Sequence, residues 1–446
     1  MTHNYSFKSM VKKYVNSSVV LIICTIVALV LANIQGTKEF FFKFWEQEVN
    51  LSIGNFNLFS HNGHPMKLIQ VINDFLMAIF FLSVGLEIKR EILVGELSSA
   101  KKAMLPIIGA CGGMLIPVLF FWLTCPSDPN MMRGVAIPLA TDIAVSLGVL
   151  SIFNKRVPIG LKIFLAALAV ADDLGGIIVI ALFYSSTIDI NYLMLAGAFV
   201  AVLMFANHWK IMSKNFYLVT GLVLWYLMLN SGIHATIAGV IVAFCVPGSL
   251  RKNAVHYIER IKENISGFNE VHVVGKHHTA ILTHQEIHKL KSIESAADKL
   301  ISPLQELEDR LHSLISFFII PLFAFANIGV DLSGMSIGGL VGGVGLSVMI
   351  GLVAGKFIGV FSFSWIAIKL GFVQLPQGSD WKSFASVCVL CGIGLTVSIF
   401  IADLSYAALG SETTLLSEAK LGILCGSLIS AIAGCLLLNK FLPKKA

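Results

Sequence analysis

The sequence is poor in charged residues. Asp, Glu, Lys and Arg make up 13% of its 446 residues, whereas soluble globular domains carry about 25%. Hydrophobic residues make up 56% of the chain, and the mean hydropathy is +0.82. A soluble fold of this composition would leave much apolar surface facing water, so an ordinary water-soluble domain is excluded. A chain of this kind is expected to lie in a lipid bilayer.

The sequence also lacks a strongly basic surface. Its formal net charge is +6, and the Lys and Arg residues occur in short blocks between apolar runs. Blocks of this kind are typical of loops that orient a membrane protein, and they differ from the dense basic patches that bind nucleic acid. We therefore expect the lipid bilayer as a partner and no nucleic acid.

A disulfide framework is absent as well. Seven of the eight cysteines lie within apolar runs, and Cys125 lies at the end of one. Thiols embedded in a membrane usually serve packing. Cys388-x-x-Cys391 matches a redox or metal motif by spacing alone, but it lies in an apolar run without nearby histidines. We interpret these cysteines as packing residues and expect no cofactor.

Long apolar runs recur along the whole chain. A membrane-spanning helix needs about 20 mostly apolar residues, and such runs cover residues 17–35, 68–92, 103–124, 133–152, 158–185, 190–207, 215–230, 232–248, 312–331, 336–368, 381–403 and 414–441. They predict an all-α membrane protein of about 12 transmembrane helices, forming a single domain over residues 1–446. The first run follows several lysines but is too long for a signal peptide, so we expect an uncleaved span. Lys and Arg are enriched in alternate loops, which predicts that both termini are cytoplasmic.

One extramembrane segment has the pattern of a β-hairpin. Residues 48–60 contain two short runs of alternating apolar residues around Gly54-Asn55, a pair typical of tight hairpin turns. We predict an outer β-hairpin here, with an irregular loop as the alternative. Because an isolated hairpin is marginally stable, it is expected to pair with a second copy.

A second extramembrane segment, residues 251–301, is polar and holds six of the twelve histidines. His284 and His288 are four residues apart and could place two metal ligands on one helix face, but no Cys or acidic ligand completes a site. We favour a solvated cytoplasmic insertion. After it, Ser302-Pro303 and Gln305 mark the start of a helix that is expected to run into the ninth span.

A few ionisable residues stand out as deep within the predicted spans. They are Asp74, Asp142, Asp172, Asp173, His234 and Lys356. Such residues are costly in a bilayer and mark functional sites. A cluster of carboxylates with a buried lysine can hold protons, or release them and bind a hard cation through oxygen. These residues therefore predict a proton-exchanging ion site, and the alternative is a structural ion-pair network. For Asp74 we favour a structural polar contact.

The fourth and eleventh spans each contain helix-breaking residues near their middle. The fourth span has Pro138, Thr141 and Asp142, and the eleventh has Gly392, Gly394 and Thr396. Broken helices expose backbone dipoles at the membrane midplane, and matching breaks in two halves indicate the binding site of an inverted-repeat transporter. Ordinary packing through glycine is the alternative.

Several strings resemble the NhaA-type sodium/proton antiporter family. They lie in family order over nearly the whole chain, at residues 85–91, 140–144, 171–175, 231–236, 321–327 and 391–396. The resemblance implies an antiporter, not an enzyme, that exports sodium or lithium in exchange for protons. It implies that the exchange is electrogenic and regulated by pH, in a multi-pass protein of the bacterial inner membrane. It also implies a homodimer joined through the outer hairpin.

The resemblance also implies roles for individual residues. Asp172 and Asp173 would bind sodium and exchange it for protons, and Lys356 would pair with Asp172 when no cation is bound. Asp142, with Thr141 beside it, would compensate the facing helix ends where the two broken spans cross. The residues implied for pH sensing are Glu87, Arg90, Glu91, His234, Glu308 and His312.

Two features depart from the family pattern, and two other functions remain open. The family usually has a short connection where residues 251–301 lie, and Asp309 stands where it often carries a histidine.

A sodium-coupled solute symporter is one alternative function. An intramembrane aspartyl protease is less favoured, because it would need aspartates on different helices and a Gly-x-Gly-Asp string.

Overall fold

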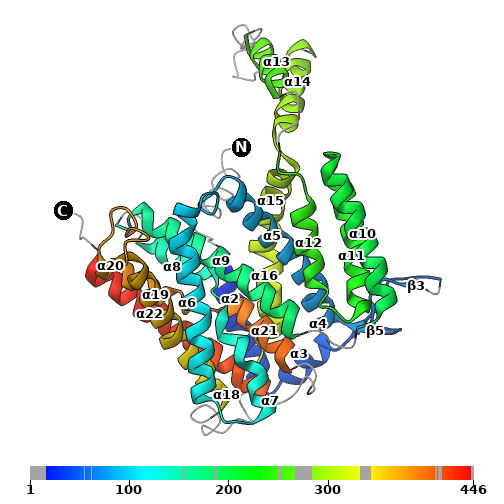
Figure 1. Ribbon diagram of the computed structural model, residues 1–446. Helices are drawn as coiled ribbons and strands as arrows, with labels where there is room; N and C mark the ends of the chain where they lie inside the picture. Colours follow the sequence, from blue (N-terminus) through cyan, green and yellow to red (C-terminus); the bar gives the residue numbers. More distant parts are fainter. Residues whose placement is uncertain are drawn as a thin grey trace, which may run out of the picture.

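The computed structural model describes residues 17–54, 56–61, 63–153, 156–184, 188–249, 254–266, 284–331, 343–406, 409 and 414–442. Most of them are helical. The helices are α2 (Ser17–Asn33), α3 (Lys38–Trp45), α4 (Leu68–Gln70), η1 (Val71–Leu76), α5 (Met77–Leu93), α6 (Ala100–Thr124), α7 (Pro129–Met132), η2 (Arg133–Leu139), α8 (Ile143–Ile152), α9 (Ile159–Phe183), α10 (Ile190–His208), α11 (Lys214–Ser231), α12 (Thr236–Cys245), α13 (Ala254–Ser266), α14 (His284–Leu300), α15 (Pro303–Leu314), η3 (Ile315–Ile319), α16 (Ile320–Asn327), α18 (Val344–Ile350), η4 (Gly351–Gly355), α19 (Lys356–Lys369), α20 (Trp381–Leu390), α21 (Leu395–Tyr406) and α22 (Thr414–Phe441). Figure 1 shows them as a bundle with one helical pair standing off it.

The bundle is that of a multi-pass membrane protein. Within the described ranges, seven helices are long and apolar enough to cross a membrane, and three bent helix pairs would raise the number to ten. The predicted seventh and eighth spans correspond to α11 and α12, which lie outside this set, and α12 has only ten residues. The predicted number of twelve therefore remains a prediction.

Three of the long spans change helical type partway along. The segments η1, η3 and η4 are π-helical and continue without a break into α5, α16 and α19. A π-helical turn holds more residues than an α-helical turn, and such turns are frequent at functional sites. Lys356 is the first residue after η4, so this turn sets the direction of its side chain.

Two spans are interrupted and cross each other at their interruptions. The pair formed by residues 129–139 and α8 bends by 45°, and the pair formed by α20 and α21 bends by 43°. Asp142 N donates to Ile393 O at 2.7 Å, which joins the two breaks directly. The approach is so close that a Cβ added to Gly394 would lie 2.7 Å from Ala140 O.

The first half of the second interrupted span begins with a strong cap. The Asp380 carboxylate accepts a hydrogen bond from Ser383 N at 3.1 Å, in a capping box that starts α20. The Ser383 hydroxyl also donates to this carboxylate and lowers the pKa of Asp380 below its usual value. An ionised carboxylate suits this place because a helix N-terminus carries partial positive charge.

The buried side chains form two clusters. The larger cluster is contributed mainly by α2, α6, α8, α9, α16 and the helices from α18 to α22. The smaller is contributed by α10, α11, α12 and the start of α15, and α5 lies between the two clusters and contributes to both. In Figure 1, α10 and α11 stand at the edge of the molecule beside α12. The helices that carry the ion-site residues contribute to the larger cluster, so α5 connects them to the second group of helices.

Short strands project from the side of the bundle, beside the ends of α10 and α11 that point away from α13 and α14 (Figure 1). The strands β2 (Ser52–Ile53) and β3 (Phe56–Asn57) pair antiparallel around Gly54, whose φ is +63°. The strand β1 (Glu48–Val49) pairs with β5 (His64–Lys67), and β4 (Ser60–His61) pairs with the same strand. The strands thus extend beyond the predicted boundary at residue 60, and β5 connects them to the span that begins at α4.

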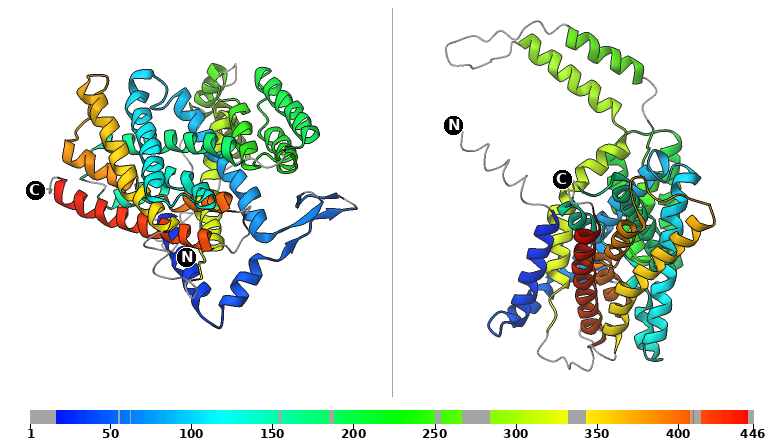
Figure 2. Two further views of the ribbon diagram at one scale, coloured as in Figure 1. Left: turned by 60° about the horizontal axis from the view of Figure 1, so that its bottom comes forward. Right: turned by 90° about the vertical axis from the view of Figure 1, so that its left-hand side faces the viewer.

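The predicted insertion contains two helices that pack on each other. The right-hand view of Figure 2 shows α13 and α14 as a separate pair above the bundle. His284 and His288 are exposed on α14, while residues 267–283, with His272, His277 and His278, lie outside the described residues. In the part of the chain that the structure describes, no three Cys, His, Asp or Glu side chains gather as metal ligands would.

The helix after the insertion begins where the sequence predicted. Ser302 Oγ accepts from Gln305 N at 3.3 Å and Pro303 occupies the first helical position. From there the helix continues to Asn327 as one candidate span. Leu304 N also donates to Pro247 O at 3.3 Å, so the two ends of the insertion lie side by side.

Candidate ion site

The two neighbouring aspartates lie halfway along α9. Asp172 is 1% exposed and Asp173 is 6% exposed. Adjacent residues in a helix point about 100° apart, so the two carboxylates face different neighbours. A charge at this depth is costly without compensation, which means that the surrounding helices must supply it.

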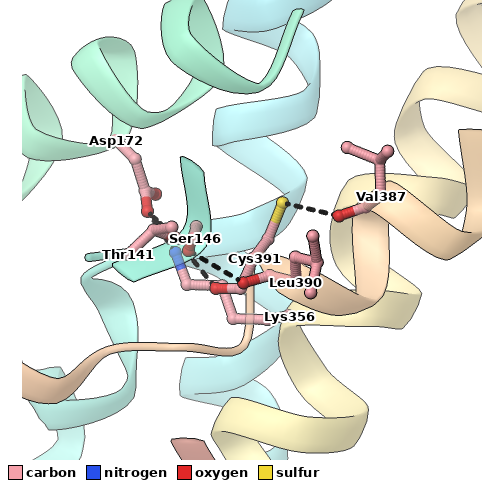
Figure 3. A network of polar contacts seen from close by, with 7 residues as sticks. All are labelled: Thr141, Ser146, Asp172, Lys356, Val387, Leu390 and Cys391. Carbon is pink, nitrogen blue, oxygen red and sulfur yellow. Dashed lines mark hydrogen bonds and ion pairs between the residues drawn. The ribbon is translucent and has the colours of Figure 1, made fainter. Parts of the chain in front are cut away.

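Lys356 supplies the compensation for Asp172. The Lys356 ammonium forms an ion pair and a hydrogen bond with Asp172 Oδ2, and both side chains are fully buried. Figure 3 shows the lysine reaching from α19 toward the carboxylate on α9. Lys356 has no other acceptor among the hydrogen bonds of the described residues. The ammonium therefore depends on this carboxylate, which it would have to share with any cation that bound there.

Thr141 joins the ion pair to the break of the eleventh predicted span. Its hydroxyl lies 2.8 Å from Asp172 Oδ2 and 3.0 Å from the carbonyl oxygen of Cys391. Figure 3 shows both acceptors beside the threonine. A hydroxyl has one hydrogen, so it can donate fully to only one of them. If Thr141 donates to Cys391 O, its oxygen lone pairs are free to face a cation at Asp172.

Asp142 caps two helices at once. Its Oδ1 accepts from Val145 N at 3.1 Å, at the N-terminus of α8. Its Oδ2 accepts from Thr396 Oγ1 at 2.8 Å and from Thr396 N at 3.3 Å, at the N-terminus of α21. Each helix N-terminus carries a partial positive charge, so one buried carboxylate stabilises both.

Asp173 is the least compensated of the buried carboxylates. Oδ1 of Asp173 and Oδ1 of Asp172 are both buried, and neither accepts a hydrogen bond from any described residue. The charged groups that act electrostatically on Asp173 are Asp172, Glu87, Asp142 and Lys356. Carboxylate oxygens are the ligands that hard cations prefer, and a carboxylate without a cation can take up a proton instead. The group can therefore exchange a cation for protons.

Four of the six residues expected to sense pH lie together where α5 meets α15. Arg90 Nε lies 2.8 Å from Glu308 Oε1, and Arg90 Nη2 lies 3.2 Å from Glu91 Oε1. Glu87 has Glu308, Arg90 and Glu91 as its charged neighbours. His312 is exposed on α15, and no described residue forms an ion pair with it. Glu87 is also a charged neighbour of Asp173, so it connects this cluster to the ion site.

His234 lies elsewhere. It precedes the N-terminus of α12. Lys89, the neighbour of Arg90, donates to Phe244 O and Val246 O at the C-terminal end of α12, which is about 15 Å away along this ten-residue helix. His234 Nε2 lies 4.0 Å from Asp74 Oδ1, and His234 Nδ1 lies 3.1 Å from Thr236 Oγ1. Any pH response of His234 therefore arises at a separate place from that of Glu308.

Sequence reasoning missed several polar groups inside the bundle. Asp403 on α21 pairs with Lys420 on α22 at 2.9 Å, with only 13% and 11% of the two side chains exposed. Asn73 and Asn327 exchange amide hydrogen bonds at 3.2 and 2.8 Å. The signal for the ion pair was present, because an acid and a lysine stand within the eleventh and twelfth predicted spans.

The chain is similar to known sodium/proton antiporters over its whole length. Residues 8–438 match the model of the family described as Na+/H+ antiporter 1. The protein from Bacteroides fragilis named Na(+)/H(+) antiporter NhaA is 49% identical over 445 residues, which is 100% of both chains. The protein of the same name from Phocaeicola vulgatus is 48% identical over 442 residues, covering 99% of this chain and 97% of the relative. The one from Glaesserella parasuis is 40% identical and covers 95% and 93%.

Proposed function

Because this chain belongs to the NhaA-type Na+/H+ antiporter family and is a membrane-embedded sodium/proton antiporter, we propose that Asp172, Asp173, Thr141 and Lys356 form its exchange site. The observation that carries the proposal is the buried Asp172–Lys356 pair at the crossing of two interrupted spans. Beside it, one oxygen of each aspartate is buried without a hydrogen-bond donor among the described residues.

In the proposed cycle, protons and sodium compete for the same oxygens. With the cation absent, Lys356 is protonated and paired with Asp172, while Asp173 holds a proton. Sodium binds the two carboxylates and Thr141 Oγ1, with Thr141 donating to Cys391 O, and the protons of Asp173 and Lys356 are released. Lithium has the same charge and oxygen preference and would use the same site. Two protons then return for each sodium exported, so the exchange carries net charge.

The two interrupted spans are proposed to be broken transmembrane helices related by an inverted repeat, in a fold of about twelve spans. Asp142 would hold the facing N-termini of α8 and α21 together while sodium passes. Gly392 and Gly394 would allow the close crossing, because a Cβ at Gly394 meets Ala140 O at 2.7 Å. Thr396 supplies two of the hydrogen bonds to Asp142.

Regulation by pH is proposed to begin at Glu87, Arg90, Glu91 and Glu308. Their mixed charge can change with proton concentration, and Glu87 lies within electrostatic range of Asp173. His312 is exposed one helical turn from Glu308 on α15, so it would lie at the edge of this cluster. His234 would contribute separately, through Asp74.

The proposed setting is the inner membrane of a bacterium, with both termini and the α13–α14 pair in the cytoplasm. The strands β1 to β5 would then lie on the outer side and join a second copy into a homodimer. Sodium-coupled solute symport and aspartyl proteolysis have little support, because the relatives are named as antiporters and Asp172 and Asp173 share one helix.

The proposal can be tested in everted membrane vesicles from a strain without its own antiporters. A respiration-driven pH gradient is established, and sodium, lithium or potassium chloride is added. Sodium and lithium should dissipate the gradient and potassium should not. Stimulation of exchange when valinomycin and potassium clamp the membrane potential at zero would contradict electrogenic exchange of this sign.

A further inference from the structure

The last helix holds the eleventh predicted span at two points. Lys420 and Ser427 on α22 are seven residues apart, so they lie on nearly the same face, about 10 Å from each other. Ser427 Oγ accepts from Gly394 N at 3.2 Å, at the break between α20 and α21. Lys420 Nζ pairs with Asp403 Oδ1 at 2.9 Å, two turns further along α21.

The same spacing recurs on α21. Thr396 and Asp403 are also seven residues apart, and Thr396 is the residue that binds Asp142 through its amide and hydroxyl groups. At one end of this face, Thr396 therefore contacts Asp142, which joins the two interrupted spans. At the other end, Asp403 pairs with Lys420. A tilt of α21 that broke the Asp403–Lys420 pair would also move the N-terminus of α21 relative to Asp142.

Asp403 has little other support. Its second oxygen, Oδ2, is buried and accepts no hydrogen bond from a described residue, and Lys420 is the charged neighbour that acts on it. Lys420 thus stabilises an acid that no cap or helix end compensates. A purely structural contact at this depth could be made by apolar side chains at lower cost, because pairing of buried ions roughly offsets their desolvation.

We propose that Asp403 and Lys420 form a positioning ion pair that sets the sodium affinity of the exchange site by fixing the tilt of α21 against Asp142. The proposal rests on the exchange site described above. The connection passes from Asp403 along α21 to Thr396 and Asp142, and from there to the adjacent Thr141, whose hydroxyl contacts Asp172. Neither Asp403 nor Lys420 contacts the ion in this scheme.

The test compares sodium-dependent exchange in vesicles for Asp403→Asn, Lys420→Met, the double variant Asp403→Asn/Lys420→Met and the conservative Asp403→Glu. The double variant buries no unpaired charge, so it separates loss of position from loss of folding. We expect it to melt near the wild-type temperature but to show an apparent KM for sodium raised about 10-fold, equivalent to about 1.4 kcal/mol of binding. The maximal rate at saturating sodium should remain within about twofold, because the exchanging groups are intact. Asp403→Glu should keep the KM near that of the wild type.

Lys38→Met is the matched control, since it breaks the Lys38–Asp331 pair, which involves no residue of α20–α22, and it should leave the KM unchanged. An unchanged KM in the folded double variant would overturn the positioning role, as would failure of Asp403→Glu to preserve the KM. Asp173→Asn in the same vesicles tests the exchange site itself. Retained exchange in that variant would refute the site, whatever the result at Asp403.

Discussion

At the scale of single residues, the three buried acids of the candidate ion site differ in how far neighbouring groups compensate their charge. Asp172 is compensated by Lys356 and Thr141, and Asp142 by two helix N-termini. Asp173 has no hydrogen-bond donor for Oδ1 among the described residues. The three acids are thus compensated to different degrees, and in the proposed cycle the least compensated one would hold a transported proton.

Neutralising either α9 aspartate should abolish exchange. In Asp172→Asn and in Asp173→Asn an amide replaces a carboxylate that both takes up a proton and contributes a negative ligand to sodium. Sodium-driven dissipation of the pH gradient should fall to the level of empty vesicles, while helix content by circular dichroism stays unchanged. Asp189→Asn is a suitable control, because Asp189 only caps the start of α10. Exchange retained in either site variant would remove that aspartate from the mechanism.

Loss of Lys356 should destabilise the protein. Lys356→Ala leaves Asp172 as a buried charge without its partner, and removing one member of a buried pair typically costs about 3–5 kcal/mol. The melting temperature of purified protein should drop clearly. The double variant Lys356→Ala/Asp172→Asn should recover part of the loss, because no unpaired charge remains. Equal melting temperatures for the wild type and Lys356→Ala would disprove the energetic role of the pair.

At the scale of elements, the crossing of the two interrupted spans depends on backbone contact. Asp142 N binds Ile393 O, and Gly394 approaches Ala140 O closely. Such contact leaves no room for side chains between the breaks. The dipoles of α8 and α21 then converge on one carboxylate, which is why Asp142 is buried without a basic partner among its hydrogen bonds.

Gly394→Ala should separate the breaks. The added Cβ would lie 2.7 Å from both Ala140 O and Ser398 Oγ, and overpacking of this kind costs about 1–3 kcal/mol. We expect a lower melting temperature and a raised KM for sodium. Gly176→Ala is the matched control, because a Cβ there meets nothing within 4 Å, and alanine in a helix is favoured over glycine by about 1 kcal/mol. If Gly394→Ala and Gly176→Ala had the same melting temperature and KM for sodium, the crossing would have room for an added methyl group.

The contact of α5 with α15 should govern pH dependence. Glu308 lies beside Arg90 and adds negative charge near Glu87. Glu308→Gln removes this charge and leaves Arg90 paired with Glu91 alone. The pH of half-maximal exchange should therefore move, with the rate at the optimum preserved. The full pH profile is measured in vesicles, beside Glu306→Gln, which breaks a neighbouring pair with Lys214 instead. An unshifted profile for Glu308→Gln would exclude Glu308 from the sensor.

At the scale of the whole molecule, α5 lies between the two clusters of buried side chains. It also carries Glu87 and Arg90 on the side toward α15. A charge change at this contact thus acts on the element that connects the ion-site helices to α10–α12. The α13–α14 pair stands apart from this arrangement (Figure 2).

Deleting residues 253–298 should leave exchange intact. The two helices pack on each other, and Leu304 N binds Pro247 O, so the ends of the deletion are already close. We expect wild-type maximal exchange and KM for sodium in vesicles, with at most a shift of the pH profile through the nearby α15. A deletion protein that folds and inserts but does not exchange would show that the pair belongs to the transport machinery.

The sequence by itself determined that the chain lies in a lipid bilayer, that it exchanges cations for protons and to which family it belongs. The scarcity of charge requires a bilayer, the acids and lysine within apolar runs predict proton and cation exchange, and the resemblance to NhaA-type antiporters is confirmed by the relatives. Bends near Pro138 and near Gly392 and Gly394 could also be predicted from the sequence, because these residues disfavour a continuous helix wherever they occur. That the bent pairs are broken transmembrane helices stays a prediction.

Only the tertiary structure decided which groups meet across the bundle. Spacing along one helix places Asp172 and Asp173 about 100° apart, but the partner of Asp172 lies 184 residues away, and its direction depends on how α9 and α19 are rotated against each other. For the same reason the sequence could not separate His234 from Glu308, or join Asp403 to Lys420. Helical periodicity acts over a few residues, whereas rotation and depth of a helix are set by the packing of all its neighbours.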